Sequence, residues 1–361
     1  MDWHLWPIFI AGVENFILIN TIFSLVSFLV VCVVKLSNVL KNKQPSFLTT
    51  LYASAIVIPP LCSTWIVISA FLPQVYLSTN QWVAEHELNH SLHLLSAWTF
   101  PLDPTFAYLA LVFLVVSLLA ANYILTKAYL TVSKIVGLLE VSAKPVDSTQ
   151  INQTKAICEQ YRLDVGLVTS DYPFSFVWGY WKAKLVISTG LLNLLTSSEL
   201  AGLLQHEVAH HQRRDNLSKW ILTLCCYSSP LFFLTGIIYR WWNEQVEILC
   251  DEIAAKRTNS PVDIASALVK LKRVANSRGA WFVQPTESAF FGEDNSDFEK
   301  RVERVLSITE SSLGSSVNHL NQPLDKPLTI IGVSYVLSLV LLFSIDPLAV
   351  HHMLETFLMI F

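Results

Sequence analysis

Two histidines with a glutamate between them are the side chains of this sequence best suited to chemistry. His206, Glu207 and His210 stand in the run His-Glu-Val-Ala-His. Residues four apart on a helix lie on one face, so both imidazoles can bind the same zinc ion. The glutamate beside the first histidine can then act as general base on a metal-bound water. The spacing therefore predicts a hydrolytic zinc site with Glu207 as its catalytic residue.

An acidic pair further along the chain can complete this site. A catalytic zinc ion takes three protein ligands and keeps one position open. Glu247 and Asp251 are four residues apart on a predicted helix. We expect Glu247 to be the third ligand and Asp251 to accept a hydrogen bond from a ligand imidazole, which would fix the ring. On these two residues alone, an ordinary charged helix face is the alternative.

The same five-residue pattern occurs a second time, from His86 to His90, with His93 as a third imidazole. This copy lies in a loop between two apolar runs, and nothing around it resembles a substrate cleft. We therefore expect a solvated amphipathic helix there, and a second zinc site is the alternative.

Two short β-strands are predicted upstream of the histidines. Residues 174–179 and 184–188 flank a turn and are rich in aromatic and β-branched side chains. A peptidase can hold its substrate as an added strand on an exposed sheet edge, and proximity in sequence suggests that four residues have this role. They are Phe176, Val177, Trp178 and Gly179. An ordinary structural hairpin is the alternative.

The composition is that of an integral membrane protein. The 361 residues are 53% hydrophobic and 14% charged, whereas soluble domains carry about 25% charged residues. The mean hydropathy is +0.47. The net charge of −4 excludes a strongly basic nucleic-acid-binding protein. The six cysteines have no paired spacing, so we expect neither structural disulfides nor a cysteine-ligated metal.

Four apolar runs are long enough to cross a bilayer, which takes about 20 residues. They cover residues 8–34, 47–72, 105–125 and 328–345, and Pro59-Pro60 is expected to break the second. Of the 24 Lys and Arg residues, three follow the first run and the other 21 lie between the third and fourth runs. Cytoplasmic segments hold the excess of positive charge, so both termini are predicted to face outward.

A fifth apolar run, residues 220–239, contains no charged side chain. If it crossed the membrane once, Glu247 would lie on the opposite side from His206. Zinc ligands lie about 2 Å from the metal, so a single crossing is incompatible with the predicted site. The run is therefore expected to be buried, to lie in the membrane interface, or to enter the membrane and return, and a return would have its turn at Ser228-Ser229-Pro230.

The order of these motifs resembles the BlaR/MecR-type membrane zinc metallopeptidases, which are gluzincins, peptidases whose third zinc ligand is a glutamate. The resemblance covers about residues 131–306. It rests on the strand hairpin, Ser-Thr-Gly-Leu-Leu, HEVAHHQRRDN, Tyr-Arg-Trp-Trp and EILCD. It implies one zinc ion per chain, bound by His206, His210 and Glu247, with Glu207 as general base.

The resulting expectation is a membrane α-helical protein with four transmembrane helices and an α+β cytoplasmic gluzincin metallopeptidase domain inserted between spans three and four. Residues 1–126 would hold three spans and an outward loop at 73–104. Residues 127–327 would form the zinc domain, and residues 328–361 the fourth span and a short outward tail. Because that tail is short, we expect the extracellular penicillin-binding sensor of some family members to be absent.

The resemblance implies an enzyme that cleaves a protein or peptide substrate at the cytoplasmic face of the inner membrane in response to a signal. The implied substrate is a cytoplasmic transcriptional repressor or the chain itself. The CAAX-processing and HtpX-type membrane peptidases are similar in motif, and quality control of membrane proteins is therefore one alternative. A non-catalytic membrane signal receptor is another. We expect contact with the lipid bilayer and no direct binding of nucleic acid.

Overall fold

The computed structural model of the chain describes residues 5–37, 43–77, 104–141, 149–179, 183–278 and 295–312. The predicted fourth span at 328–345 and the cluster of His86, His90 and His93 lie outside these residues. Both therefore remain predictions.

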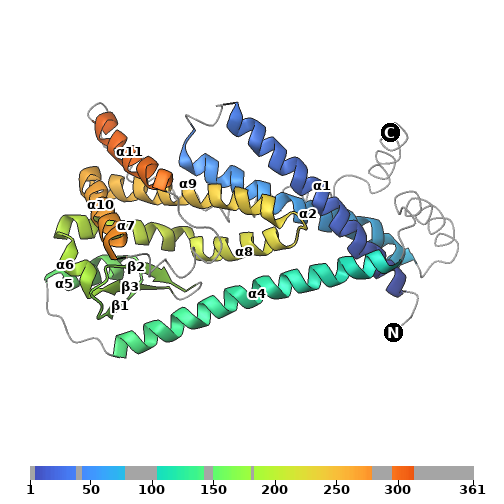
Figure 1. Cartoon of the computed structure of the whole chain (residues 1–361), viewed down its shortest axis with the longest axis horizontal. Coiled ribbons are helices and arrows are strands. Elements are labelled where there is room, and N and C mark those ends of the chain that lie inside the picture. Colours follow the sequence, from blue (N-terminus) through green and yellow to red (C-terminus); the bar gives the residue numbers. More distant parts are fainter. Residues whose placement is uncertain are drawn as a thin grey trace.

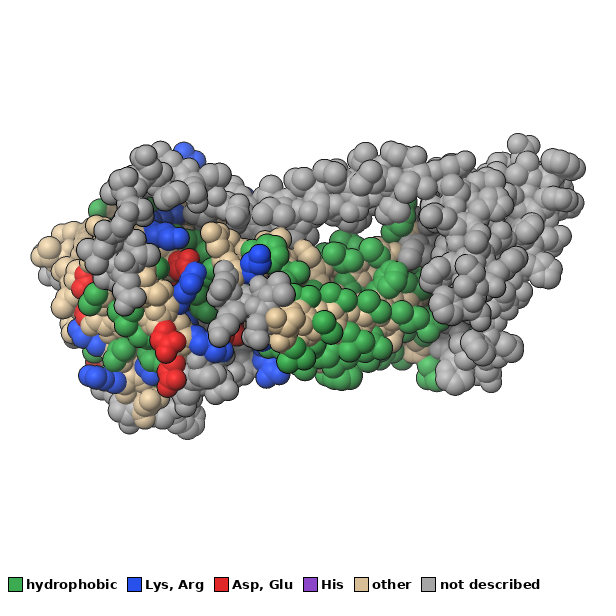
Figure 2. Space-filling model, turned by 90° about the horizontal axis from the view of Figure 1, so that it is seen from above, with side chains coloured by type: hydrophobic (Ala, Val, Ile, Leu, Met, Phe, Trp, Pro, Cys, Tyr) green, Lys and Arg blue, Asp and Glu red, His purple; other side chains and the backbone are tan. Residues whose placement is uncertain are grey.

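Three long helices carry the first three apolar runs. They are α1 (Leu5–Leu36), α2 (Pro45–Leu77) and α4 (Pro104–Val141). Within the described part of the chain, each contains a stretch long and apolar enough to cross a membrane. The outward faces of α1 and α4 expose large hydrophobic side chains such as Val33 and Leu119, as expected of helices surrounded by lipid. Figure 2 shows hydrophobic side chains over the middle of the molecule and charged ones gathered at one end.

The expected break at Pro59-Pro60 is wrong, because α2 continues through both prolines. Pro59 has no backbone N–H to donate to the carbonyl of Ala55, four residues earlier. The hydroxyl of Ser27 in α1 donates to that carbonyl instead, at 2.9 Å. A neighbouring helix thus satisfies the freed backbone group, which is how prolines are tolerated in membrane helices.

A three-stranded sheet forms the β part of the water-exposed end. Its strands are β1 (Asp164–Val168), β2 (Ser175–Trp178) and β3 (Lys184–Ser188), in the order β1-β3-β2. The strand β3 pairs in parallel with β1 and antiparallel with β2. As a result, β2 is an edge strand of this sheet.

Helices around this sheet make the core that positions the histidines. They are α5 (Thr149–Gln160), α6 (Thr189–Leu194), α7 (Ser197–Arg213) and α10 (Pro261–Arg278). The fully buried Leu185 and Ile187 of β3 belong to one hydrophobic cluster with Leu200, Leu204 and Val208 of α7. The apolar side chains of α7 therefore face the sheet side, and its polar residues are left for another face.

The fifth apolar run is divided between two helices, α8 (Asp215–Tyr227) and α9 (Phe232–Thr258). The chain turns between them at residues 228–231, and Figure 1 shows α8 and α9 extending from the sheet end toward α1 and α2. Ile238 and Trp242 of α9 are fully buried in a hydrophobic cluster that includes Tyr52 and Ile56 of α2. This helical hairpin is thus packed against membrane helices, and its second arm returns toward α7.

The last described helix, α11 (Asn295–Ser312), packs on α9 and α10. Val305 of α11 is buried with Ala254 and Ala255 of α9 and with Ile264 and Leu268 of α10. Its position brings basic side chains of α11 against the acidic face of α9.

Candidate metal centre

Helix α7 begins at a strong N-terminal cap that holds it in place. Thr196 is the N-cap residue, and the carboxylate of Glu199 accepts a hydrogen bond from its backbone N–H at 2.8 Å. Glu199 is buried and also accepts hydrogen bonds from Ser266 (2.6 Å) and Lys270 (2.7 Å) of α10. The helix ends at Arg213, and its C-cap residue Arg214 has left-handed backbone angles (φ 57°). These features define the two ends of the helix that carries His206, Glu207 and His210.

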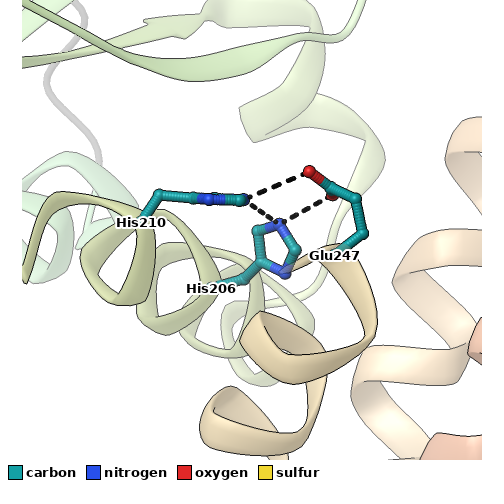
Figure 3. A group of neighbouring side chains, drawn as sticks. All are labelled: His206, His210 and Glu247. Carbon is teal, nitrogen blue, oxygen red and sulfur yellow. Dashed lines mark hydrogen bonds and ion pairs between the residues drawn. The ribbon is translucent and has the colours of Figure 1, made fainter. Parts of the chain in front are cut away.

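The three predicted ligands converge at one point between α7 and α9 (Figure 3). The Nε2 atoms of His206 and His210 are 3.1 Å apart. Glu247 places Oε2 at 3.6 Å from the first and Oε1 at 3.5 Å from the second. Ligands 2.0–2.2 Å from a tetrahedral metal lie about 3.3–3.6 Å from one another. The two imidazole nitrogens and the carboxylate are donors that zinc takes, and their separations lie near this range, so these three residues would be able to hold a zinc ion.

Two buried carboxylates hold the far nitrogens of the imidazoles. Asp251 Oδ1 lies 2.8 Å from His206 Nδ1, and Asp215 Oδ2 lies 2.9 Å from His210 Nδ1. Both carboxylates are 1% exposed. Such contacts keep the Nδ1 side of each ring occupied and turn Nε2 toward the metal position. The sequence analysis predicted the role of Asp251 but missed that of Asp215, which is the first residue of α8.

Arg301 of α11 also reaches this centre. Its Nε donates to Asp251 Oδ2 at 2.8 Å and its Nη2 to Asp251 Oδ1 at 3.2 Å. The same Nη2 lies 3.5 Å from Glu247 Oε2. A buried charge needs a partner, and Arg301 supplies one for both carboxylates of α9. The sequence offered no local signal for this, because 50 residues separate Arg301 from Asp251.

Charge interactions in this buried cluster keep its carboxylates ionised. Burial alone would raise the pKa of Glu247, but His210, His206 and Arg301 hold it well below its usual range. Burial likewise opposes ionisation of Asp251, whose pKa is lowered by Arg301 and His206. Burial disfavours the charged form of His206, yet Asp251 and Glu247 raise its pKa to about 10. Glu247 is thus kept in the ionised form, which is the form in which a carboxylate binds a metal.

Glu207 points from α7 toward the edge strand. It is buried, and its Oε1 accepts a hydrogen bond from the hydroxyl of Ser175 in β2 at 2.9 Å. This contact links the predicted general base to the strand expected to bind substrate. Sequence reasoning did not single out Ser175, because only the packing of β2 on α7 brings the two side chains together.

The four residues predicted to bind substrate lie along β2 and its end. Phe176, Val177 and Trp178 are in the strand, and Gly179 follows it with φ 105°. The N–H of Ser188 donates to the carbonyl of Phe174. Backbone hydrogen bonds involve every second residue along one edge of an antiparallel strand. The backbone N–H and C=O groups of Phe176 and Trp178 therefore point toward β3, as those of Phe174 do.

The backbone groups of Ser175 and Val177 consequently point away from β3, to the side of β2 where the described part of the chain places no further strand. The amide of Asn216 occupies part of that edge, since its Nδ2 donates to the carbonyl of Val177 at 2.9 Å and lies 3.3 Å from that of Gly179. An added strand would therefore pair first with Ser175.

Cys250 belongs to a second group of potential ligands that is poorly suited to a metal. All six are unpaired. Cys250 Sγ lies 3.5 Å from His210 Nδ1 and 3.8 Å from Asp215 Oδ2, so these three residues form another group of potential ligands. However, burial and the neighbouring carboxylates raise the pKa of Cys250 well above its usual range. The thiol is therefore neutral and a weak ligand, since metals bind the thiolate.

Comparison with known proteins agrees with this geometry. Residues 151–278, which include both histidines and Glu247, match the model of Peptidase family M48. Part of the chain is 34% identical over 101 residues to the "Plastoglobule-localized metallopeptidase 48, chloroplastic" of Arabidopsis thaliana. The alignment covers 25% of this chain and 28% of that protein, so the chain spans less than a third of that relative's length. Residues 151–278 are thus a metallopeptidase domain of the M48 family.

Proposed function

We propose that this protein is a zinc-dependent endopeptidase embedded in the inner membrane, with its active site at the cytoplasmic face. One observation carries the proposal: the Nε2 atoms of His206 and His210 lie 3.1 Å apart, and each lies within 3.6 Å of a carboxylate oxygen of Glu247. Glu207 follows His206 directly in the same helix. The M48 match and the three candidate membrane helices support the same class of enzyme.

The residues around the site are proposed to have three roles: metal binding, proton transfer and orientation of the general base. His206, His210 and Glu247 would hold the zinc ion, which polarises a carbonyl and lowers the pKa of a bound water. Glu207 takes a proton from the attacking water and passes it to the leaving amine. The hydroxyl of Ser175 donates to Oε1 of Glu207, which orients the carboxylate and leaves Oε2 for the water.

Substrate binding is proposed to use the open edge of β2. An extended peptide can add to an exposed strand through backbone hydrogen bonds. The hydroxyl of Ser175 contacts Glu207, so we expect a peptide paired with the backbone of Ser175 to pass close to the metal site. The substrate class is thus an extended, unfolded stretch of a protein.

The orientation rests on the distribution of Lys and Arg described above. Lys35, near the end of α1, places its Nζ 3.7 Å from the ring centre of Trp241 in α9. Trp and basic residues are enriched at the membrane surface, so this contact supports a membrane boundary at this level, which we propose to be the cytoplasmic one. Glu247 is six residues beyond Trp241, or about 9 Å along the helix. Cleavage would then occur close to the membrane surface.

Two classes of substrate are compatible with this proposed activity. The BlaR/MecR resemblance favours signal-responsive cleavage of one target, a cytoplasmic repressor or the chain itself. The match to Peptidase family M48 is equally compatible with an HtpX-like enzyme that degrades or processes membrane proteins. Comparing new protein N-termini in cells that make the parent or Glu207→Gln would separate them. One dependent cleavage supports the first, and many cleavages in unrelated membrane proteins support the second.

The proposed activity is tested on the full-length protein purified in detergent, with zinc content and casein cleavage as readouts. Glu207→Gln should keep one zinc ion and lose activity by about 100-fold or more. His206→Ala/His210→Ala should lose both, whereas His86→Ala/His90→Ala, the matched change in the second His-Glu-x-x-His copy, should lose neither. A parent without zinc after metal addition, or an active Glu207→Gln, would contradict the proposal.

A further inference from the structure

A buried asparagine in the middle of α1 makes contacts that point to a role beyond membrane insertion. Asn20 is fully buried within a candidate span. Its Nδ2 donates to the backbone carbonyl of Ser228 at 3.0 Å, and its Oδ1 accepts from Ser24 of α1 at 3.3 Å. Polar side chains inside a membrane are costly and are retained where they pair with a specific partner. Here the partner is the turn between α8 and α9.

The turn needs such a partner because the helical hydrogen-bond pattern is interrupted there. Helix α8 ends at Tyr227 and α9 begins at Phe232, with Pro230 in between. Irregular backbone at membrane depth is stable where neighbouring protein groups satisfy it. The hydroxyl of Ser229 accepts from the N–H of Leu231, and Asn20 donates to the carbonyl of Ser228. Asn20 therefore docks the tip of the hairpin on α1.

One rigid element connects this tip to the metal centre. Helix α9 is continuous from Phe232 to Thr258 and carries Glu247. The fifteen residues from Phe232 to Glu247 span about 22 Å. A slide of one residue along the helix axis, about 1.5 Å, would already exceed the tolerance of a zinc–ligand bond. The place where the tip docks thus determines where the carboxylate of Glu247 lies.

A second contact holds the same helix at another level. Lys35 of α1 lies over the ring of Trp241 at 3.7 Å, and this ring also packs near Tyr52 of α2, with 6.1 Å between the ring centres. Asn20 and Lys35 are fifteen residues apart on α1, again about 22 Å. Helix α1 thus contacts the hairpin near its tip and near the membrane surface.

The other two ligands are held by different neighbours. Helix α7, which carries His206 and His210, packs against the sheet and is tied to α10 through Glu199 and Lys270. The ligand set is therefore shared between a helix anchored in the water-exposed domain and a helix anchored in the membrane. A metal that bridges them must couple the two parts energetically.

We propose that Asn20 is a positioning residue for the metal centre, because it docks the membrane-embedded hairpin on α1 and thereby places Glu247 opposite the histidines. The inference rests on the proposed zinc site. Reciprocity of coupling requires that zinc binding strengthens hairpin docking by the same factor by which docking strengthens zinc binding. Asn20, which contacts the turn before α9 rather than the ligands themselves, thus controls metal affinity without touching the site.

The test uses the full-length protein in detergent micelles and measures zinc affinity by competition with a chelator. Asn20→Leu keeps the size of the side chain and removes its amide. Hydrogen bonds between membrane helices contribute modestly, so the affinity for zinc should fall by about 3- to 20-fold. The matched control is Thr21→Val, which removes a hydroxyl that bonds within α1 to Ile17. It should bind zinc as the parent does.

A native thiol provides the reciprocal measurement. Cys226 lies buried in α8 near the turn, and Cys158 lies buried in the core around the sheet. Zinc should slow alkylation of Cys226 in the parent, with Cys158 as internal reference. In Asn20→Leu, Cys226 should react faster, and in His206→Ala/His210→Ala zinc should give no protection.

Each result has a defined meaning. If the parent binds no zinc, the proposed function fails and the positioning role fails with it. If the parent binds zinc and Asn20→Leu binds it equally well with unchanged reactivity of Cys226, only the positioning role is overturned. Should Asn20→Leu fail to fold, Asn20→Ala decides, because it also removes the amide that donates to Ser228. Unchanged zinc affinity in a folded Asn20→Ala protein would then refute the proposal.

Discussion

Replacing Asp251 by asparagine separates the charge of this carboxylate from its shape. The side chain is 1% exposed and contacts His206 Nδ1 at 2.8 Å and Arg301 Nε at 2.8 Å. Hydrogen bonds to charged groups contribute about 1.5–3 kcal/mol. Since about 1.4 kcal/mol is a factor of ten, loss of the negative charge beside His206 alone should weaken zinc binding roughly 10- to 100-fold, the range found for partners of ligand histidines.

A second effect acts in the same direction. Arg301 already lies 3.5 Å from Glu247 Oε2. Once Asp251 is neutral, the guanidinium loses its stronger partner and is expected to move its charge toward Glu247. It would then compete with the metal for this ligand. The zinc affinity of Asp251→Asn should therefore fall by at least about 10- to 100-fold.

The assay is a chelator competition titration of the full-length protein at constant pH. Glu252→Gln is the matched control, because Glu252 is the adjacent buried acid of α9 and pairs with Arg304 of α11 at 2.6 Å. The loss of the Glu252 charge should change zinc affinity by less than about threefold, because its ion pair with Arg304 lies outside the ligand set. An Asp251→Asn protein with unchanged affinity, or an equal loss in Glu252→Gln, would refute the assigned role.

Two further predictions concern the scaffold. Burial opposes ionisation of Glu199, but hydrogen bonds from Lys270, Ser266 and the N-cap lower its pKa to about 2. The ionised Glu199 should stabilise the fold fully above about pH 4.5, and this stabilisation should be lost as the pH falls toward 2. The variant Glu199→Gln should be about 0.5–2 kcal/mol less stable than the parent. Its thermal-unfolding midpoint should change less with pH over this range. In Gly190→Ala the new Cβ would meet the backbone carbonyl of Asp171 at 2.6 Å. Thermal unfolding should show a loss of about 1–3 kcal/mol, and an unchanged midpoint would contradict the reasoning.

Local patterns in the sequence were sufficient for much of the candidate site. The spacing of His206 and His210, and of Glu247 and Asp251, follows the helical repeat, which depends only on neighbouring residues. A metal joining both pairs requires them on one side of the membrane, and this excluded a single crossing for residues 220–239. Helix α9 returning toward α7 satisfies that requirement. The orientation of the spans and the fourth span stay predictions.

Other features depended on contacts between segments that are distant in sequence. Asp215 beside His210, Ser175 beside Glu207 and Arg301 beside Asp251 have no periodic signal, because packing between elements decides which side chains meet. The continuity of α2 through Pro59 also required a hydroxyl from another helix.

The sequence by itself determined which residues could form a metal centre, since the geometry of a single helix fixes the spacing of its side chains. Only the tertiary structure decided how Glu247 reaches the histidines, since that depends on where α9 is docked. Asn20 in α1 supplies part of that docking through the turn at Ser228. A hydrogen bond between two helices has no counterpart in the pattern of either helix alone.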